Sequence, residues 1–386
     1  MSTVLASFVV VVAAAAALAI PAPAAASVIR GDEQLEALVL AGSPGEANEV
    51  TVRYDSARSG WQVTDVVGIT VQHPACVSQA PAEAFCRLPL WFVLGDGNDR
   101  FEATNAETPF MTQIERVKRP NGYTVVEVPV GVTVYGGAGD DTLIGHDAHD
   151  VIYGGDGRQT PGSGDDAIIG RGQDDHLAGE DGNDRVEGGA GYDEISGNNG
   201  DDWLEGGEDD DSIEVLLVDE DGPRSPGNDH LEGGPGGDFL GADQGSDAAF
   251  GGPGDDSVAL VAGKLDDPLA RPDGRRSVAT CGAGNDLVDV GNNDTVTGDC
   301  ERLATYPYCP KRCAVSLTTR IRGRTRALTR QHVRASDSVT FVRIPLGAPA
   351  RKRLAVARSV RVEAVSKMAG FRKARLVRFT VIRTPR

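Results

Sequence analysis

One motif recurs along the middle of the chain and restricts what it can fold into. Fourteen aspartates stand at nearly regular nine-residue intervals between Tyr135 and Cys300. Glycines precede most of them, and an aliphatic residue usually follows two positions later, as in GGAGYDEIS at residues 188–196. A disordered linker has no reason to keep an aliphatic residue in phase with each aspartate, so the pattern predicts a folded repeat. The fourteen are Asp141, Asp150, Asp166, Asp175, Asp184, Asp193, Asp202, Asp211, Asp229, Asp238, Asp247, Asp256, Asp286 and Asp294.

Each nonapeptide divides into a turn and a short strand. In the last three residues the aliphatic side chain points to one face, because side chains alternate along a strand. The glycines of the first six residues permit a turn with positive φ and close approach of neighbouring turns. Two nonapeptides make one coil, and coils stack about 4.8 Å apart. Aspartates two repeats apart then face each other in two columns, one with Asp166, Asp184 and Asp202 and the other with Asp175, Asp193 and Asp211.

Facing carboxylates call for cations. Two of them about 5 Å apart repel by roughly 3 kcal/mol at an effective dielectric constant of about 20. Because a whole domain is stable by only about 5–15 kcal/mol, unrelieved columns would prevent stacking. Carboxylate and carbonyl oxygens suit Ca²⁺ rather than zinc or copper, and Mg²⁺ prefers to keep its waters. We therefore predict that the fourteen aspartates are calcium ligands for several ions.

The motif G-G-x-G-x-D-x-U-x, in which U is a large aliphatic residue, resembles the repeats-in-toxin (RTX), or hemolysin-type, calcium-binding repeats. The resemblance covers residues 136–299. It implies a parallel β-roll with calcium between successive turns, unfolded inside the cell and folded in calcium-rich surroundings. Many relatives are exported whole through an uncleaved C-terminal signal. This chain has an N-terminal apolar segment and a basic tail instead, which weakens the analogy with secreted toxins.

The series has irregular steps. The step from Asp150 to Asp166 is nearly two repeats long and contains an inserted loop at residues 158–161, and the step from Asp211 to Asp229 is two repeats long and is filled by residues 215–223. An inserted loop keeps later aspartates in their columns, whereas a missing coil edge swaps them, and the sequence leaves both open. One further copy, at residues 95–101, lacks a partner two repeats away, so Asp99 is expected to be a turn residue rather than a ligand.

Four segments are expected. Residues 1–26 resemble a secretory signal, with an apolar run at 9–20 and Ala24–Ala26 before Ser27, although no Lys or Arg precedes the run. No other apolar segment approaches membrane length, so we expect a secreted chain without a transmembrane anchor. Residues 27–134 predict a β-rich cap with strands at 50–54, 61–63, 68–71 and 124–128. Residues 135–300 predict the β-roll, and residues 301–386 a small basic β-rich domain.

The six cysteines occur as three close pairs near the edges of the repeats. Fifteen pairings are possible, and proximity favours Cys76–Cys86, Cys281–Cys300 and Cys309–Cys313. Disulfides fit an exported protein. Irregular spacing without a nearby histidine argues against zinc.

Charge divides the chain into two unequal parts. Residues 301–386 carry 22 Lys and Arg against three acids, a net +19, whereas residues 1–300 carry −38. The basic domain either caps the roll or attaches to an anionic surface such as envelope polymer or lipid headgroups. Its arginines favour attachment. Alternating strands predict β-structure with a short helix at 349–358, and the scarcity of aromatic residues argues against nucleic acid as a partner.

Signals of catalysis are missing from the sequence. No G-x-S-x-G or H-E-x-x-H occurs, and His146 and His149 belong to a diverged repeat. Enzymes with such repeats carry a catalytic domain before them, and that domain is typically larger than the segment at 27–134. The sequence thus predicts an all-β, secreted calcium-binding protein with a structural or cell-surface-binding role, and not an enzyme. The alternatives are an adhesin or an accessory part of a secreted toxin or hydrolase.

Overall fold

All regular elements in the described part of the chain are β-strands, and no helix long and apolar enough to cross a membrane occurs there. The helix expected at 349–358 lies outside that part. The all-β prediction is confirmed. The computed structural model describes residues 27–32, 37–42, 45–87, 90–104, 112–119, 122–157, 164–215, 227–242, 245–260, 276–289, 294–297, 300, 302–305, 312–321, 324–334, 342–345, 359–368 and 375–382.

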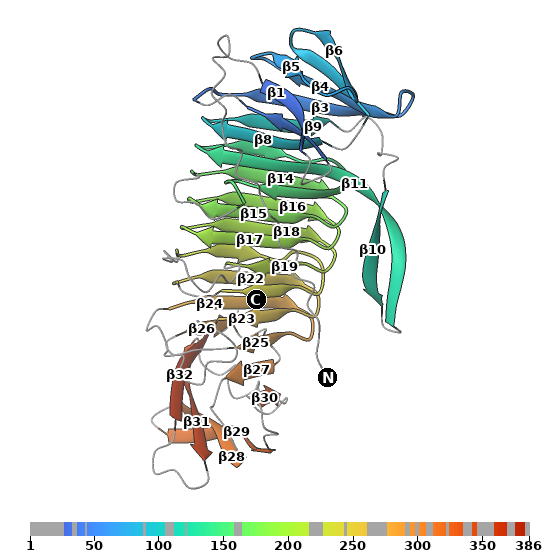
Figure 1. The fold of residues 1–386 in the computed structure, drawn as a ribbon. Helices are drawn as coiled ribbons and strands as arrows, with labels where there is room; N and C mark the ends of the chain where they lie inside the picture. Colours follow the sequence, from blue (N-terminus) through green and yellow to red (C-terminus); the bar gives the residue numbers. More distant parts are fainter. Residues whose placement is uncertain are drawn as a thin grey trace.

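The repeats form two ladders of short parallel strands, and successive strands along the chain alternate between the ladders (Figure 1). This is the predicted parallel β-roll. One ladder contains β13 (His149–Tyr153), β15 (His176–Asp181), β17 (Glu194–Asn199), β19 (Ser212–Glu214), β21 (Phe239–Gly241), β23 (Ser257–Ala259) and β25 (Leu287–Asp289). The other contains β12 (Thr142–Ile144), β14 (Ala167–Gly172), β16 (Arg185–Ala190), β18 (Trp203–Glu208), β20 (His230–Glu232), β22 (Ala248–Pro253), β24 (Val278–Ala283) and β26 (Thr295–Thr297).

The core between the ladders is one apolar side chain wide in each strand. Ile168 pairs with Val186, and Val186 with Leu204, so each coil is two nonapeptides long, as predicted. All three side chains are fully buried. Even Ala249, a small residue for a core position, is fully buried at the same phase. Each coil therefore depends on its neighbours to complete its core.

The irregular steps in the series are inserted loops. Leu204 pairs with Leu231 and Ile213 with Leu240, so the residues between Asp211 and Asp229 add a loop without replacing a coil edge. The earlier step behaves in the same way, because Leu143 pairs with Ile168. The aspartates that follow each insertion therefore stay in their original columns.

The N-terminal strands continue the roll. β8 (Leu90–Asp96) and β9 (Arg100–Thr104) pair in parallel with β11 (Gly122–Ala138) and β12, so the sheets run across the expected boundary at residue 134. β10 (Thr112–Arg119) and β11 form an antiparallel arm that leaves the roll (Figure 1). The strands that precede β8 in the chain pair with one another mainly antiparallel. These are β1 (Ser27–Asp32), β2 (Ala37–Ala41), β3 (Glu49–Asp55), β4 (Gly60–Asp65), β5 (Ile69–Val71), β6 (Cys76–Ala80) and β7 (Glu83–Cys86).

The C-terminal strands extend both ladders past the last repeat. β27 (Arg302–Thr305) pairs with β25 and then with β30 (Val342–Pro345). β32 (Arg375–Ile382) pairs with β26 and is followed by β31 (Ser359–Met368), β28 (Arg312–Ile321) and β29 (Arg324–Arg334). The segment therefore caps the roll, which was the first of the two alternatives, and attachment to an anionic surface stays a prediction. The charge count could not show that the last coil has unpaired backbone groups to cover.

Two of the three expected disulfides are present. Cys76–Cys86 joins β6 to β7, and Cys281–Cys300 joins β24 to the chain after β26. Cys309 lies outside the described residues, so the third pairing stays a prediction.

Stacked glycines set the spacing of the coils. A Cβ on Gly182, at φ +148°, would overlap the carbonyl oxygen of Gly164 in the preceding coil. A Cβ on Gly95, at φ +112°, would have no neighbouring atom within 4 Å. Both alanine substitutions share the cost of positive φ. We predict that Gly182→Ala destabilises the calcium-loaded protein by about 1–3 kcal/mol more than Gly95→Ala, because only the former overpacks. Thermal unfolding of both variants measures this, and equal losses of stability would contradict it.

Candidate metal centre

The aspartates of the repeats form two buried columns tied together by the backbone. In each column one carboxylate oxygen accepts the main-chain N–H of the aspartate in the preceding coil. The distances are 2.8 Å from Asp166 N to Asp184 Oδ1 and 2.8 Å from Asp175 N to Asp193 Oδ1. The first column contains Asp99, Asp141, Asp166, Asp184, Asp202, Asp229, Asp247, Ser277 and Asp294. The second contains Asp150, Asp175, Asp193, Asp211, Asp238, Asp256 and Asp286.

The second oxygen of most of these carboxylates is buried without a hydrogen-bond donor. A buried acceptor left unpaired costs about 1–3 kcal/mol, and more when it is charged. Repeated along both columns, this cost must be relieved by a bound cation or by protonation of the carboxyls. The orphaned Oδ2 atoms belong to Asp99, Asp141, Asp166, Asp175, Asp184, Asp193, Asp202, Asp211, Asp238 and Asp256.

The first glycine of the repeat leaves an oxygen-lined space beside this atom. A Cβ on Gly188 would overlap Asp193 Oδ2 and lie 2.6 Å from the carbonyl oxygen of Gly206 in the next coil. Gly170 and Gly206 make the same approach to Asp175 and Asp211. Calcium takes six to eight oxygen ligands, including backbone carbonyls. The glycine is therefore required where carboxylate and carbonyl oxygens converge.

Side chains alone do not complete a site. Among the described residues no group of three or more His, Cys, Asp or Glu side chains lies close enough together to hold a metal. An ion held by Asp184 or Asp202 must therefore also use turn carbonyls. This donor set, with one carboxylate from each turn, fits calcium rather than zinc. When bound, the ion supplies positive charge to the buried carboxylates.

Metal-free carboxylates in these columns hold protons strongly. Burial raises the pKa of Asp175 to about 10, and the facing carboxylates of Asp150 and Asp193 contribute to that rise. Burial raises the pKa of Asp166 and of Asp202 to about 8 for the same reason. Near neutral pH a proton and a cation thus compete for these positions.

Two members of the first column differ from expectation. Asp99 is not an isolated turn residue, because its N–H donates to Asp141 Oδ1 at 2.7 Å and its own Oδ1 accepts the N–H of Asn48. The β10–β11 arm separates it from Asp141 by 42 residues, which hid the pairing. Leu94 stands where the repeats have their first glycine. Ser277 takes the place of an aspartate between Asp247 and Asp294, so a search for aspartates missed it.

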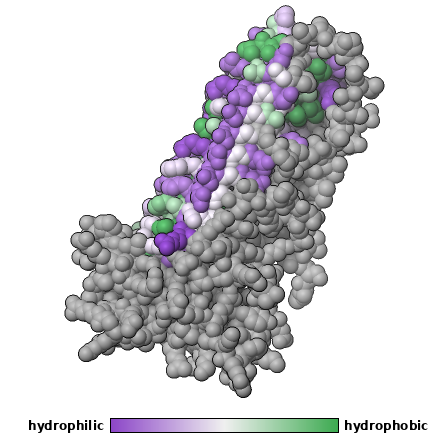
Figure 2. Space-filling model, turned by 90° about the vertical axis from the view of Figure 1, so that its left-hand side faces the viewer, coloured by the Kyte–Doolittle hydropathy of each residue, from purple (hydrophilic) through white to green (hydrophobic). Residues whose placement is uncertain are grey.

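A second ladder on the surface of the turns was also missed. The residue before each column aspartate is Asp, Asn or Ser at many turns, and its side-chain oxygen accepts an N–H from the next coil. Asn183 N donates to Asp165 Oδ1 at 2.8 Å, and Asn228 N donates to Asp201 Oδ1 at 2.7 Å. A hydrophilic stripe runs along the roll on the face shown in Figure 2. These exposed side chains fix the stacking and leave the buried aspartates for cations.

A family model describes this pattern. The model of the RTX calcium-binding nonapeptide repeat matches residues 133–158, 160–195, 179–213 and 225–258. Four copies of the RTX calcium-binding nonapeptide repeat thus lie within residues 133–258. The RTX matches contain twelve of the fourteen predicted ligands, and the columns extend beyond them to Asp99 and Asp294. No significant match was found among curated proteins or solved structures.

The raised pKa values predict how acid affects the calcium-free RTX repeats. A carboxyl whose pKa is raised from 3.8 to about 7–8 in the folded state binds more protons folded than unfolded between these values. In calcium-free buffer the roll should therefore gain stability as the pH falls from about 8 to about 4. Circular dichroism of metal-stripped protein at pH 7.5 and 4.5 tests this. More β signal at pH 7.5 than at pH 4.5 would contradict it.

Proposed function

We propose that this chain is a secreted calcium-binding protein whose β-roll folds as calcium binds, and that it has a structural or cell-surface-binding role. The proposal rests on the two columns of buried carboxylates, most with an oxygen that lacks a donor. Ionised and unpaired, such groups oppose folding. A cation that binds only the folded roll adds its binding free energy to stability.

The same coupling supports export. Extracellular calcium sites typically have dissociation constants of about 10⁻⁴–10⁻³ M, so the repeats would stay unfolded inside a cell and fold outside it. The disulfides Cys76–Cys86 and Cys281–Cys300 favour an oxidising compartment. The N-terminal apolar run, outside the described residues, supports a secretory signal.

A structural or surface-binding role is favoured over catalysis. The repeat pattern already accounts for the column aspartates, so none of them needs a role as a catalytic acid or base. His146, His176 and His230 also lie within repeats. Screening the purified protein for hydrolase activity, and for binding to whole cells, separates the accessory-protein alternative from the adhesin alternative.

The first prediction from this proposal concerns folding. In chelator at pH 7.5, circular dichroism should show that the repeats have lost their β signal, and calcium at about 10⁻⁴–10⁻³ M should restore it cooperatively. Magnesium at the same concentration is the control and should restore less, because it keeps its waters. A β-roll spectrum that chelator leaves unchanged would refute coupled folding.

The second prediction from this proposal concerns attachment to an anionic envelope polymer or lipid surface. Its support is the net charge of +19 on residues 301–386, which the capping geometry does not explain. We predict that the full-length protein binds anionic vesicles or envelope material better than neutral vesicles, and that binding weakens as salt rises. Equal binding to neutral and anionic surfaces would exclude attachment by charge.

A further inference from the structure

Asp150, the first carboxylate of the second column, differs from the others in its hydrogen bonds. Its Oδ1 accepts the N–H of Val132 at 2.6 Å, and its Oδ2 accepts the N–H of His146. In the next coil Asp175 Oδ2 is buried without a donor. The oxygen that most repeats leave open for a cation is therefore already occupied at Asp150. In the preceding coil, Val132 stands in the column where another aspartate would be.

The cause lies at His146, which replaces the second glycine of the repeat. That position has φ of +123° at Gly189, and even Arg171 and Glu180 adopt +91° and +78° there. His146 does not adopt positive φ, and its N–H points at Asp150. Its ring is buried and packs edge-on against Trp61, with centroids 6.1 Å apart. The N-terminal strands thus hold His146 in the backbone conformation that closes the site.

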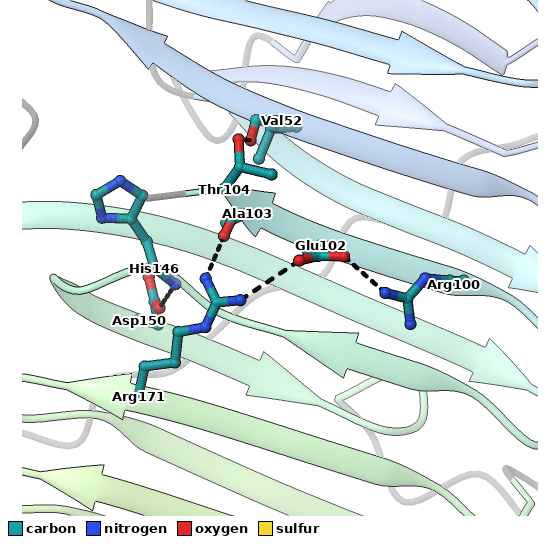
Figure 3. Close-up of polar contacts among 8 residues, drawn as sticks. All are labelled: Val52, Arg100, Glu102, Ala103, Thr104, His146, Asp150 and Arg171. Atoms are coloured by element: carbon teal, nitrogen blue, oxygen red, sulfur yellow. Dashed lines mark hydrogen bonds and ion pairs between the residues drawn. The ribbon is translucent and has the colours of Figure 1, made fainter. Parts of the chain in front are cut away.

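Arg171, in β14 of a neighbouring coil, connects the roll to β9 of the N-terminal strands. Its guanidinium donates to the carbonyl oxygen of Ala103 at 2.6 Å and contacts Glu102 at 3.5 Å, both in β9 (Figure 3). Burial raises the pKa of Asp150. The N–H groups of Val132 and His146 and the charge of Arg171 oppose that rise. Two fixed N–H donors therefore occupy the oxygens of Asp150, and the charge of Arg171 acts on the same carboxyl.

We infer that Asp150 is a structural carboxylate that does not bind calcium, and that with His146 and Arg171 it forms a calcium-independent junction between the N-terminal strands and the roll. This replaces the role as a ligand predicted for Asp150 from its spacing. The calcium positions of the second column then begin at Asp175. The inference rests on the proposed function, because it concerns which carboxylates calcium reaches.

The junction gives the coils a preformed end on which to stack. Tyr54, Trp61, Phe92 and Phe101 form an aromatic core in the N-terminal strands, and Cys76–Cys86 crosslinks them. None of these contacts requires a cation. Stacking on an ordered neighbour avoids the cost of forming the first coil unaided. The N-terminal strands and the junction should therefore remain folded when calcium is removed and the central repeats unfold, since Asp99 is the one column carboxylate among these strands with an unpaired oxygen.

Matched substitutions in neighbouring coils test the inference. Native mass spectrometry of the full-length protein counts bound calcium ions for the unsubstituted chain, Asp150→Asn and Asp175→Asn. We expect Asp175→Asn to lose at least one ion and Asp150→Asn to lose none. An equal loss from both variants would overturn the inference. An unsubstituted chain that binds no calcium would instead overturn the proposed function.

A measurement on the unsubstituted protein covers the case in which Asp150→Asn fails to fold. Hydrogen–deuterium exchange in chelator should show protected amides in β3, β4 and β9 and rapid exchange in β16 and β18. With calcium, β16 and β18 should become protected by tenfold or more, about 1.4 kcal/mol. If β3, β4 and β9 exchange as fast as β16 in chelator, the calcium-independent junction is wrong.

Discussion

The structure depends on burying a carboxylate at nearly every turn while giving a hydrogen-bond donor to only one of its oxygens. The backbone supplies that donor, as between Asp184 N and Asp202 Oδ1, which holds the carboxylate at a constant place in each coil. The other oxygen is left among glycines and carbonyls. A polar atom buried in this way is costly without a partner, and in the function proposed above calcium is that partner as the coils stack.

The remaining features of the roll follow from that constraint. Glycines must stand where carbonyl oxygens of neighbouring coils converge, which leaves the turns little freedom to form in isolation. The core is one side chain wide, so hydrophobic burial by a single coil is too small to hold it folded. Stability is gained only as coils add to an existing end. The N-terminal strands supply one end, and β30 and β32 cover the other.

Much of this could be predicted from the spacing of residues. The coil length, the two columns and the core positions such as Val186 follow from a nine-residue period and the alternation of side chains. Pairings across long separations could not be predicted. Asp99 joins its column across 42 residues, and Ser277 carries the column without a carboxylate. The hydrogen bond from His146 N–H to Asp150 Oδ2 depends on the backbone angle of His146, which the contact with Trp61 helps to set. No spacing rule contains that angle.

The position of the ions is the most direct measure of whether these columns bind calcium. Crystals of the calcium-loaded protein can be measured at a wavelength where calcium scatters anomalously. We predict two rows of anomalous peaks along the roll, beside the Oδ2 atoms of Asp166, Asp184 and Asp202 on one side and of Asp175, Asp193 and Asp211 on the other. Peaks confined to exposed acidic side chains, with none beside the buried oxygens, would contradict calcium as the partner on which the fold depends.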